Sequence, residues 1–379
     1  MSRSKTEMSC SKERIAFFLP ALYGGGAERV ILNLASGFAR KGYPVDLVLA
    51  EAVGPFLAEV PVSIRVVELH QKRLRAMRTV ASMPALLKYI RRSCPIVLVS
   101  ALQANYVALW VKALSKIPLR VAITEHSTFT YQIQQFPRGI RWLVFELTRR
   151  LYPLADEIIA VSKGVADDLA KAIKIPVESI RVIYNPIVTP EIKSKAIEPC
   201  KHPWFRNQEI PVILSIGRLT DLKDFGTLIY AFSLVRKNRV ARLVILGEGD
   251  ERSRLESMVR RYHLQEDVML PGFVPNPYPY LSQSSLFVLS SRWEGLPTVL
   301  VEALYCGARI IATDCKSGPR EILGNGLYGD LVTVGSATDL AHAIENGLRT
   351  PRIKNSDESW MPYEYETVVN KYMTTLIGA

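Results

Sequence analysis

Short apolar runs that alternate with helical stretches are the feature that most constrains how this chain can fold. In the first half, five such runs have strand length and few polar residues: Arg14–Pro20, Val45–Ala50, Ile96–Ser100, Val121–Thr124 and Glu157–Val161. A strand that is apolar throughout is buried on both faces, and helices between such strands connect them in parallel. The pattern therefore predicts an α/β domain with a parallel, doubly wound sheet.

The same alternation starts again after a segment rich in proline and charge, residues 186–211. Five more strand candidates follow it: Val212–Ile216, Ala241–Leu246, Val268–Leu270, Leu286–Ser290 and Arg309–Thr313. A length of 379 residues is enough for two domains that each bury a core. We expect a first Rossmann-like domain over residues 1–190 and a second over residues 191–350. Ligands would then bind in a cleft that faces the carboxyl ends of both sheets.

Two glutamates of the second domain, Glu294 and Glu302, flank the start of a predicted helix. Pro297 can open this helix, because its missing N–H falls where the helix offers no acceptor. Thr298 and Glu302 lie four residues apart and share one face of the helix. The free amides and dipole of a helix N-terminus attract anions. The pattern fits a nucleotide sugar whose hydroxyls donate to the two carboxylates; taken alone, it also fits a solvated acidic helix start.

Arg218 and Lys223 form a second candidate group in the segment Gly217–Phe225. Arg218 follows the first predicted strand of the second domain, at the carboxyl edge where ligands bind. A guanidinium and an ammonium together match the charge of a diphosphate. Two solvated loop cations are the alternative, but this loop is expected to face the same cleft as the helix at Pro297.

The first domain offers a glycine loop and a histidine. Gly24–Gly26 lies between a strand and a helix, where glycine lets the backbone approach a phosphate closely. The loop lacks the full Gly-x-Gly-x-x-Gly spacing, so a plain tight turn is equally compatible with it. His126 follows another predicted strand at its carboxyl end. It is a candidate for contact with the sugar or the acceptor, and a structural role is the alternative.

Metal chemistry has little support in the sequence. There is no Asp-x-Asp motif, and the five histidines lack the spacing of metal ligands. We expect neither a metal nor another cofactor, because two cations can neutralise a leaving diphosphate in place of Mg²⁺. The five cysteines are scattered without a Cys-x-x-Cys pair, which argues for a reducing compartment and against a disulfide framework. No apolar stretch precedes Glu13, so we expect no signal peptide.

Several short motifs, taken together and in order, resemble the retaining GT-B glycosyltransferases of family 4. They are Gly-Gly-Ala-Glu-Arg (25–29), Glu-His (125–126), Val-Ile-Tyr-Asn-Pro (182–186), Gly-Arg-Leu (217–219) with Lys223, Pro-Gly-Phe (271–273), Glu-Gly-Leu-Pro-Thr-Val (294–299) with Glu302, and Ser-Gly-Pro-Arg-Glu-Ile-Leu (317–323). The resemblance implies the GT-B fold, in which two Rossmann-like doubly wound parallel-sheet domains face a cleft. It also implies that residues 351–379 form a C-terminal helix that crosses back to the first domain.

The resemblance assigns roles to individual residues. It implies that Arg218 and Lys223 bind the donor diphosphate, while Glu294 and His126 contact the transferred sugar. It places Glu302 on the ribose hydroxyls. The remaining donor-binding positions that it implies are Gly25 and Gly26, closing from the first domain, Phe273 and Val274 near the base, and Gly295, Leu296, Pro297, Thr298 and Val299, capping sugar and phosphate.

The resemblance also suggests an activity. It implies front-face attack with retention, in which the departing phosphate oxygen takes the acceptor proton. The motifs look like those of the branch that builds bacterial surface glycans on polyprenyl-diphosphate carriers, which mostly uses UDP-sugars. We therefore expect a hexosyltransferase that moves a hexose or N-acetylhexosamine, for example from UDP-N-acetylgalactosamine or UDP-galactose, to a lipid-linked oligosaccharide. Such acceptors serve lipopolysaccharide and related surface polysaccharides.

The net charge of +12 comes from one segment. Residues 72–150 contain 14 Lys and Arg against only Glu125 and Glu146, which is also +12. A basic patch indicates an anionic partner, and each basic residue near an anionic membrane gains about 1 kcal/mol. Leu74–Arg92 and Arg138–Tyr152 mix basic and apolar residues at helical spacing, as interfacial helices do. We expect a cytoplasmic protein that binds peripherally to the inner face of the cytoplasmic membrane.

Three other functions are compatible with parts of the sequence. A GDP-mannose-dependent mannosyltransferase of the same fold would share these motifs. A two-domain sugar-nucleotide epimerase would need acid and base carboxylates in the cleft, for which Glu294 and Glu302 are the only candidates. A nucleic-acid-binding protein would use the basic patch, but the chain has no recognisable nucleic-acid-binding module and little aromatic interleaving, so we expect no nucleic acid as a partner.

Overall fold

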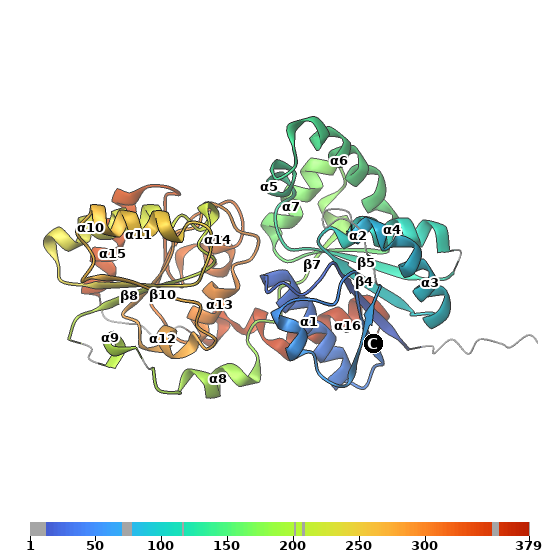
Figure 1. Ribbon diagram of the computed structural model, residues 1–379, viewed down its shortest axis with the longest axis horizontal. Helices are drawn as coiled ribbons and strands as arrows, with labels where there is room; N and C mark the ends of the chain where they lie inside the picture. Colours follow the sequence, from blue (N-terminus) through green and yellow to red (C-terminus); the bar gives the residue numbers. More distant parts are fainter. Residues whose placement is uncertain are drawn as a thin grey trace, which may run out of the picture. The chain divides into compact units, whose positions relative to one another are not determined.

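The computed structural model describes residues 13–69, 78–115, 117–200, 202–206, 209–350 and 356–378. The chain divides into two compact units. Unit 1 contains residues 1–186 and 366–379, and unit 2 contains residues 187–365. Each unit is built on its own parallel sheet with helices packed on it (Figure 1).

Unit 1 contains a seven-stranded parallel sheet in the order β3-β2-β1-β4-β5-β6-β7. Its strands are β1 (Ile15–Leu19), β2 (Val45–Leu49), β3 (Ile64–Glu68), β4 (Val97–Ala101), β5 (Arg120–Glu125), β6 (Glu157–Ala160) and β7 (Ile180–Val182). Every residue of β1, β2 and β4 is buried, and all of them except Asp46 and Ser100 are apolar.

Helices cover the sheet of unit 1. They are α1 (Gly26–Arg40), α2 (Arg78–Ala81), α3 (Met83–Ser93), α4 (Ala104–Ser115), α5 (Phe129–Gln134), α6 (Arg138–Leu151), α7 (Lys163–Ile173) and α16 (Tyr365–Ile377). The apolar face of α1 packs on β1, where the rings of Phe38 and Phe17 meet edge to face at 5.7 Å. The C-terminal helix α16 joins this unit. Arg120 of β5 donates to the carbonyl of Leu376 at 3.0 Å, and Lys41 pairs with Glu366 at 2.9 Å.

Unit 2 contains a six-stranded parallel sheet in the order β10-β9-β8-β11-β12-β13. Its strands are β8 (Val212–Ile216), β9 (Arg242–Leu246), β10 (Val268–Gly272), β11 (Leu286–Leu289), β12 (Ile310–Thr313) and β13 (Asp330–Val332). Its helices are α8 (Pro190–Ala196), α9 (Pro203–Arg206), α10 (Phe225–Asn238), α11 (Arg252–Arg261), α12 (Tyr278–Gln283), α13 (Thr298–Tyr305), α14 (Pro319–Ile322) and α15 (Ala337–Arg349). One core cluster includes Leu228 and Phe232 of α10 together with Leu243 of β9.

The predicted fold class is confirmed, because both halves form doubly wound parallel sheets. The structure adds three strands that the sequence did not indicate, β3, β7 and β13, which all lie at sheet edges. It divides the chain between Pro186 and Ile187, whereas the sequence placed the boundary at residue 190. Among the described residues, no helix is both long and apolar enough to cross a bilayer.

Three of the described cysteines, Cys200, Cys306 and Cys315, are free thiols.

Candidate active site

Three loops meet at the carboxyl edge of the unit 2 sheet. They follow β8, β11 and β12, which are consecutive neighbours in the sheet, and cover residues 217–224, 290–297 and 314–318. The carboxyl ends of parallel strands lie at one edge, so the sheet order brings these loops together. The edge holds most of the residues that the sequence singled out.

Lys223 and Glu294 form an ion pair between two of these loops. The Nζ atom of Lys223 lies 2.5 Å from Oε1 of Glu294, and the two side chains are only 18% and 9% exposed. Lys223 ends the short 3₁₀ turn Asp221–Lys223, and Glu294 lies in the loop after β11. A charge pair in this setting is less screened than one on the surface. The structure thus brings together a cation and a carboxylate that the sequence named separately.

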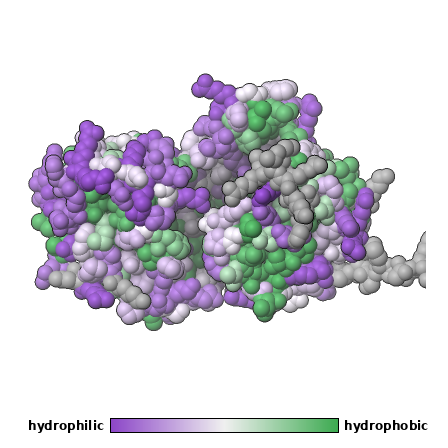
Figure 2. Space-filling view, viewed as in Figure 1, coloured by the Kyte–Doolittle hydropathy of each residue, from purple (hydrophilic) through white to green (hydrophobic). Residues whose placement is uncertain are grey.

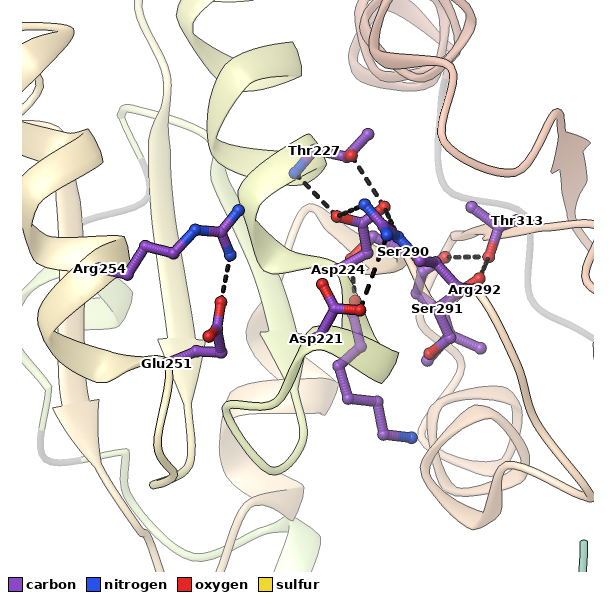
Figure 3. Close-up of polar contacts among 11 residues, drawn as sticks. Asp221, Asp224, Thr227, Glu251, Arg254, Ser290, Ser291, Arg292 and Thr313 are labelled. Carbon is purple, nitrogen blue, oxygen red and sulfur yellow. Dashed lines mark hydrogen bonds and ion pairs between the residues drawn. The ribbon is translucent and has the colours of Figure 1, made fainter. Parts of the chain in front are cut away.

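Buried hydroxyl groups connect the loops around this pair (Figure 3). Ser290 donates to the backbone carbonyl of Lys223 at 2.7 Å. Ser291 donates to Oε1 of Glu294 at 2.6 Å, and Thr313 donates to the backbone carbonyl of Ser291 at 2.6 Å. The loop that carries Lys223 is therefore held to the end of β11, which is held in turn to the end of β12.

A second ion pair fixes the start of α10. Asp224 is buried, has a positive φ of 47° and accepts from the hydroxyl and amide of Thr227 as the helix cap. The guanidinium of Arg292 donates to Asp224 at 2.9 Å (Figure 3). The Arg292 amide also donates to the carbonyl of Leu222 at 2.9 Å. These bonds fix the backbone on both sides of Lys223.

Arg218 occupies the loop after β8 with its side chain exposed. Its guanidinium makes no hydrogen bond or ion pair with another described residue. The backbone below it is tightly packed, since a Cβ added at Gly247 would lie 2.0 Å from the carbonyl oxygen of Gly217. Gly247 has a φ of 138°, which favours glycine. The loop is therefore fixed while the Arg218 side chain is available to a ligand.

The helix predicted at Pro297 is α13, which begins at Thr298 with Pro297 as its N-cap. Gly295, Leu296 and Pro297 are buried, and Thr298 and Val299 are half-buried. The preceding loop rests on the loop after β12, where Ser317 donates to the carbonyl of Gly295 at 2.9 Å and a Cβ added at Gly318 would lie 2.5 Å from Cδ of Pro297. The amides of Thr298 and Val299 have no acceptor within the helix, which suits an anion, whereas the Leu300 amide donates to the carbonyl of Pro297 at 3.0 Å.

The other predicted donor-binding residues of unit 2 lie in different places. Glu302 is one turn into α13 and accepts a hydrogen bond of 3.3 Å from the hydroxyl of Tyr278 in α12. Phe273 and Val274 follow β10, which is separated from β8 by β9. The Phe273 ring is 74% exposed, which leaves it available for stacking.

The glycine loop of unit 1 precedes α1. Gly25 is the N-cap of this helix, and its amide donates to the carboxylate of Glu28, which is buried. Glu28 therefore engages the amide of Gly25, one of the two glycines that the resemblance implies would close over the donor. Gly26 begins α1, and a Cβ added there would meet no atom within 4 Å. Gly26 is thus the more open of the two positions.

His126 lies directly beyond β5, at the same carboxyl edge of the unit 1 sheet. Burial lowers the pKa of His126 to about 4, so the imidazole is neutral at pH 7. Its Nε2 atom lies 3.1 Å from the hydroxyl of Thr124, which itself donates to the carbonyl of Ser100. The proton of that hydroxyl is thus engaged, so Nε2 is the donor and Nδ1 is the acceptor. A ligand hydroxyl can donate to Nδ1.

The neighbouring Glu125 is buried, and the structure gives it only neutral partners. Tyr152 and Asn105 donate to Oε1 at 2.5 and 2.9 Å, and Gln132 donates to Oε2 at 2.7 Å. No described Lys or Arg pairs with it. Burial raises the pKa of Glu125, and the three hydrogen bonds oppose that rise. The carboxylate joins β5, α4, α5 and the turn at Tyr152.

Sequence reasoning missed the hydroxyl groups and one thiol at the unit 2 edge. Ser290, Ser291 and Thr313 are all 0–1% exposed. Cys315 is buried near the ion pair, and burial together with the charge of Glu294 raises its pKa to about 12, so the thiol stays protonated. The only available signal was the adjacent serine pair directly after a strand. Among the described residues, no three His, Cys, Asp or Glu side chains are grouped to hold a metal ion.

Two family descriptions match the chain: Glycosyltransferase Family 4 over residues 24–190 and Glycosyl transferases group 1 over residues 199–366. A relative from Campylobacter jejuni, N-acetylgalactosamine-N,N'-diacetylbacillosaminyl-diphospho-undecaprenol 4-alpha-N-acetylgalactosaminyltransferase, is 29% identical over 352 residues, which cover 91% of this chain and 92% of the relative. A second C. jejuni relative, GalNAc-alpha-(1->4)-GalNAc-alpha-(1->3)-diNAcBac-PP-undecaprenol alpha-1,4-N-acetyl-D-galactosaminyltransferase, is 25% identical over 374 residues, with 95% and 97% covered. Among solved structures, a glycosyltransferase from Rickettsia africae has the same fold, with a TM-score of 0.78 and 17% identity over 97% of this chain and 98% of that one.

Proposed function

The chain belongs to the GT-B glycosyltransferases of group 1 and family 4, and we propose that it transfers a hexose or N-acetylhexosamine from a nucleotide sugar to a lipid-linked oligosaccharide. The acceptor would serve bacterial surface-glycan synthesis. Both C. jejuni relatives support this proposal, because their names describe transfer of N-acetylgalactosamine to undecaprenol-linked sugars. Each aligns with more than nine tenths of this chain.

The Lys223–Glu294 ion pair beside the N-terminus of α13 is the observation that carries the proposal. A donor diphosphate would bind the exposed guanidinium of Arg218, the ammonium of Lys223 and the first amides of α13. Glu294 would then accept from a hydroxyl of the sugar, and Glu302 from the ribose. The pair thus holds two groups that recognise opposite parts of one ligand.

We propose the retaining reaction that the resemblance to family 4 implies, and these contacts would support it. The acceptor hydroxyl attacks the anomeric carbon from the face that the diphosphate leaves, so the new C–O bond replaces the old one with retention. The acceptor proton passes to the departing phosphate oxygen. Arg218, Lys223 and the α13 amides stabilise the charge that develops on the diphosphate, so the reaction needs no metal ion. His126 would accept from a ligand hydroxyl through Nδ1.

We propose UDP as the nucleotide, with N-acetylgalactosamine or galactose as the sugar. The likeness to two N-acetylgalactosaminyltransferases favours this sugar class. GDP-mannose is the second candidate, because the same cations and helix end would bind its diphosphate. The exposed ring of Phe273 would stack on either base.

Thermal stabilisation of the purified protein by UDP, GDP and ADP tests the proposal directly. A ligand that binds only the folded state raises the melting temperature by mass action. We expect a response to UDP and not to GDP or ADP, followed by transfer from UDP-N-acetylgalactosamine or UDP-galactose to a polyprenyl-linked acceptor. A response to GDP alone would favour the mannosyltransferase. A folded sample that responds to no nucleotide would count against the transferase assignment.

We further propose that unit 1 binds the cytoplasmic face of an anionic membrane through α6. Trp142 and Leu143 are 73% and 57% exposed near the start of this helix, beside the exposed Arg138. Figure 2 shows apolar side chains among polar ones over the part of unit 1 that contains α5 and α6. Aromatic and basic side chains on one helix end are typical of interfacial binding.

The basic segment at 72–150 contributes less free charge than its composition indicated. Arg141 donates to the carbonyls of Gln134 and Phe136, and Arg149 and Arg150 pair with Glu146. On α3, by contrast, three exposed cations make no ion pair with described residues, namely Lys88, Arg91 and Arg92. Residues 72–77 and 116 of the segment lie outside the described residues. The membrane contact would therefore combine the apolar start of α6 with the free cations.

Sedimentation with vesicles tests the membrane proposal. We expect binding to phosphatidylglycerol vesicles to fall at least fivefold in Leu143→Ser, because a buried leucine contributes about 2 kcal/mol at an apolar interface. Val240→Ser is the matched control, since Val240 is also exposed but lies in unit 2. Equal binding of both variants, or no dependence on anionic lipid, would contradict the proposal.

A further inference from the structure

Glu294 receives two hydrogen bonds on the same oxygen. Lys223 Nζ and Ser291 Oγ both donate to Oε1, at 2.5 and 2.6 Å. Oε2 accepts no hydrogen bond from another described residue. A carboxylate with one oxygen fixed from two sides has its second oxygen set in direction, ready to accept from a ligand.

The two donors differ in how firmly they are held. The ammonium of Lys223 ends a flexible side chain, and the diphosphate of a donor would compete with Glu294 for it. Ser291 is fully buried, and its backbone is tied to β12 by the hydrogen bond from Thr313. Its hydroxyl therefore keeps its place when the ammonium turns toward the ligand.

We propose that Ser291 is a positioning residue that keeps Glu294 Oε2 aimed at a hydroxyl of the donor sugar once Lys223 engages the diphosphate. This inference rests on the proposed function and refines it. It assigns the support of sugar recognition to one serine hydroxyl and the support of diphosphate recognition to another. Ser291 serves the sugar through Glu294. Its neighbour Ser290 donates instead to the backbone carbonyl of Lys223 and so serves the diphosphate.

Adjacent serines with different partners allow a matched comparison. Ser290→Ala and Ser291→Ala each remove one buried hydroxyl from consecutive positions after β11. Ser215→Ala is the stability control, because Ser215 is also buried and donates to the carbonyl of Val288 at 2.6 Å, between β8 and β11 within the sheet. Ser291→Thr restores a hydroxyl at the tested position.

The experiment measures the dissociation constant of UDP and kcat/KM for whichever of UDP-N-acetylgalactosamine and UDP-galactose the wild type uses. For Ser291→Ala we expect UDP binding within twofold of wild type and kcat/KM lower by about tenfold, the size of one hydrogen bond to a charged group. Ser290→Ala should weaken UDP binding and kcat/KM together. Ser291→Thr should recover most of the kcat/KM, and Ser215→Ala should leave both quantities unchanged.

The outcomes separate the two proposals. If the wild type binds no UDP and transfers no sugar, the proposed function fails before Ser291 is tested. If the wild type is active and Ser291→Ala loses UDP binding and kcat/KM in equal proportion, Ser291 acts only on the loop as a whole and the inference is wrong. Unchanged kcat/KM in a folded Ser291→Ala variant overturns it as well.

Discussion

Glu125 and Glu294 are carboxylates at the carboxyl edges of two parallel sheets, in unit 1 and unit 2 respectively. Glu125 is buried and, among the residues that the structure describes, receives hydrogen bonds from Tyr152, Asn105 and Gln132 alone. Glu294 is partly open, pairs with a cation and has one oxygen that accepts no hydrogen bond from the described part of the chain. Burial without a nearby cation raises the pKa of Glu125.

The difference separates a structural carboxylate from one that is available for chemistry. The hydrogen bonds of Glu125 join four elements of unit 1, and all of its oxygen atoms are occupied by the protein. Glu294 joins two loops and keeps accepting capacity for a ligand. The same residue type at equivalent edges of similar sheets is thus committed to packing in one unit and to binding in the other.

The largest effect should come from removing Lys223, the cation that pairs with Glu294 in unit 2. We expect Lys223→Ala to lower kcat at least a hundredfold, because it removes a charge that stabilises the leaving diphosphate, an effect of about 3 kcal/mol. Lys112→Ala is the matched control in unit 1, where Lys112 pairs with Asp156 at 2.6 Å near the surface. That variant should keep its kcat. Near-normal turnover in a folded Lys223→Ala protein would refute the assignment of this lysine.

The second largest contrast should be in the stability cost of adding a methyl group to a glycine, Gly247 in unit 2 or Gly26 in unit 1. Gly247→Ala places a methyl group 2.0 Å from the Gly217 carbonyl at a φ of 138°, so we expect it to lose about 3 kcal/mol of folding free energy. Gly26→Ala in unit 1 meets no atom within 4 Å and lies at a helix start, so its stability should change by less than about 0.5 kcal/mol. Urea denaturation measures both. Equal losses would show that the loop after β9 relaxes around the new methyl group.

A comparison of the two glutamates gives the third prediction. Glu125→Gln turns an amide donor toward the Gln132 side chain, which also donates, and should cost about 2 kcal/mol of stability. Glu294→Gln should reduce turnover strongly and change the melting temperature little. Calorimetry and a transfer assay on both variants measure the contrast. A Glu125→Gln protein that melts like the wild type would mean that its hydrogen bonds contribute little.

Central strands could be predicted from the sequence because burial on both faces makes them apolar throughout. Three of the four edge strands, β3, β7 and β13, could not, because their outer positions face water. In β3, for example, Arg65, Val66 and Glu68 are exposed, so the segment has no continuous apolar run. The polar residues of an edge strand resemble those of a loop, and only the pairing of β3 with β2 identifies it.

The candidate site could be predicted only in part for a similar reason. Arg218, Lys223 and Glu294 are charged residues in motifs, and they stood out. Ser290, Ser291 and Thr313 did not, because a buried serine and a surface serine look alike in a sequence. Their hydrogen bonds depend on β11 lying between β8 and β12, which sheet order alone sets. The roles assigned to individual residues remain predictions.

The smallest expected effect concerns His126, next to Glu125 in unit 1. Its pKa is lowered to about 4 in the folded protein and is near 6.5 when unfolded, so the unfolded state binds the proton first as the pH falls. Its contribution to stability is therefore present above pH 6.5 and lost as the pH falls toward 4. From pH 7.5 to pH 5.5 we expect the free energy of unfolding of the wild type to fall by about 1 kcal/mol more than that of His126→Gln. Urea denaturation at the two pH values measures the difference.

Glu125 should act in the opposite direction, because its folded pKa is raised and the native state binds the proton first. Its contribution to stability is largest below its unfolded pKa and is lost as the pH rises through the folded value. The pH effects of His126 and Glu125 on the free energy of unfolding therefore partly cancel in the wild type. In the Glu125→Gln background, this free energy should fall more steeply as the pH falls. If Glu125→Gln leaves the slope unchanged, the carboxylate is ionised across the whole range. The three donors around it would then outweigh its burial.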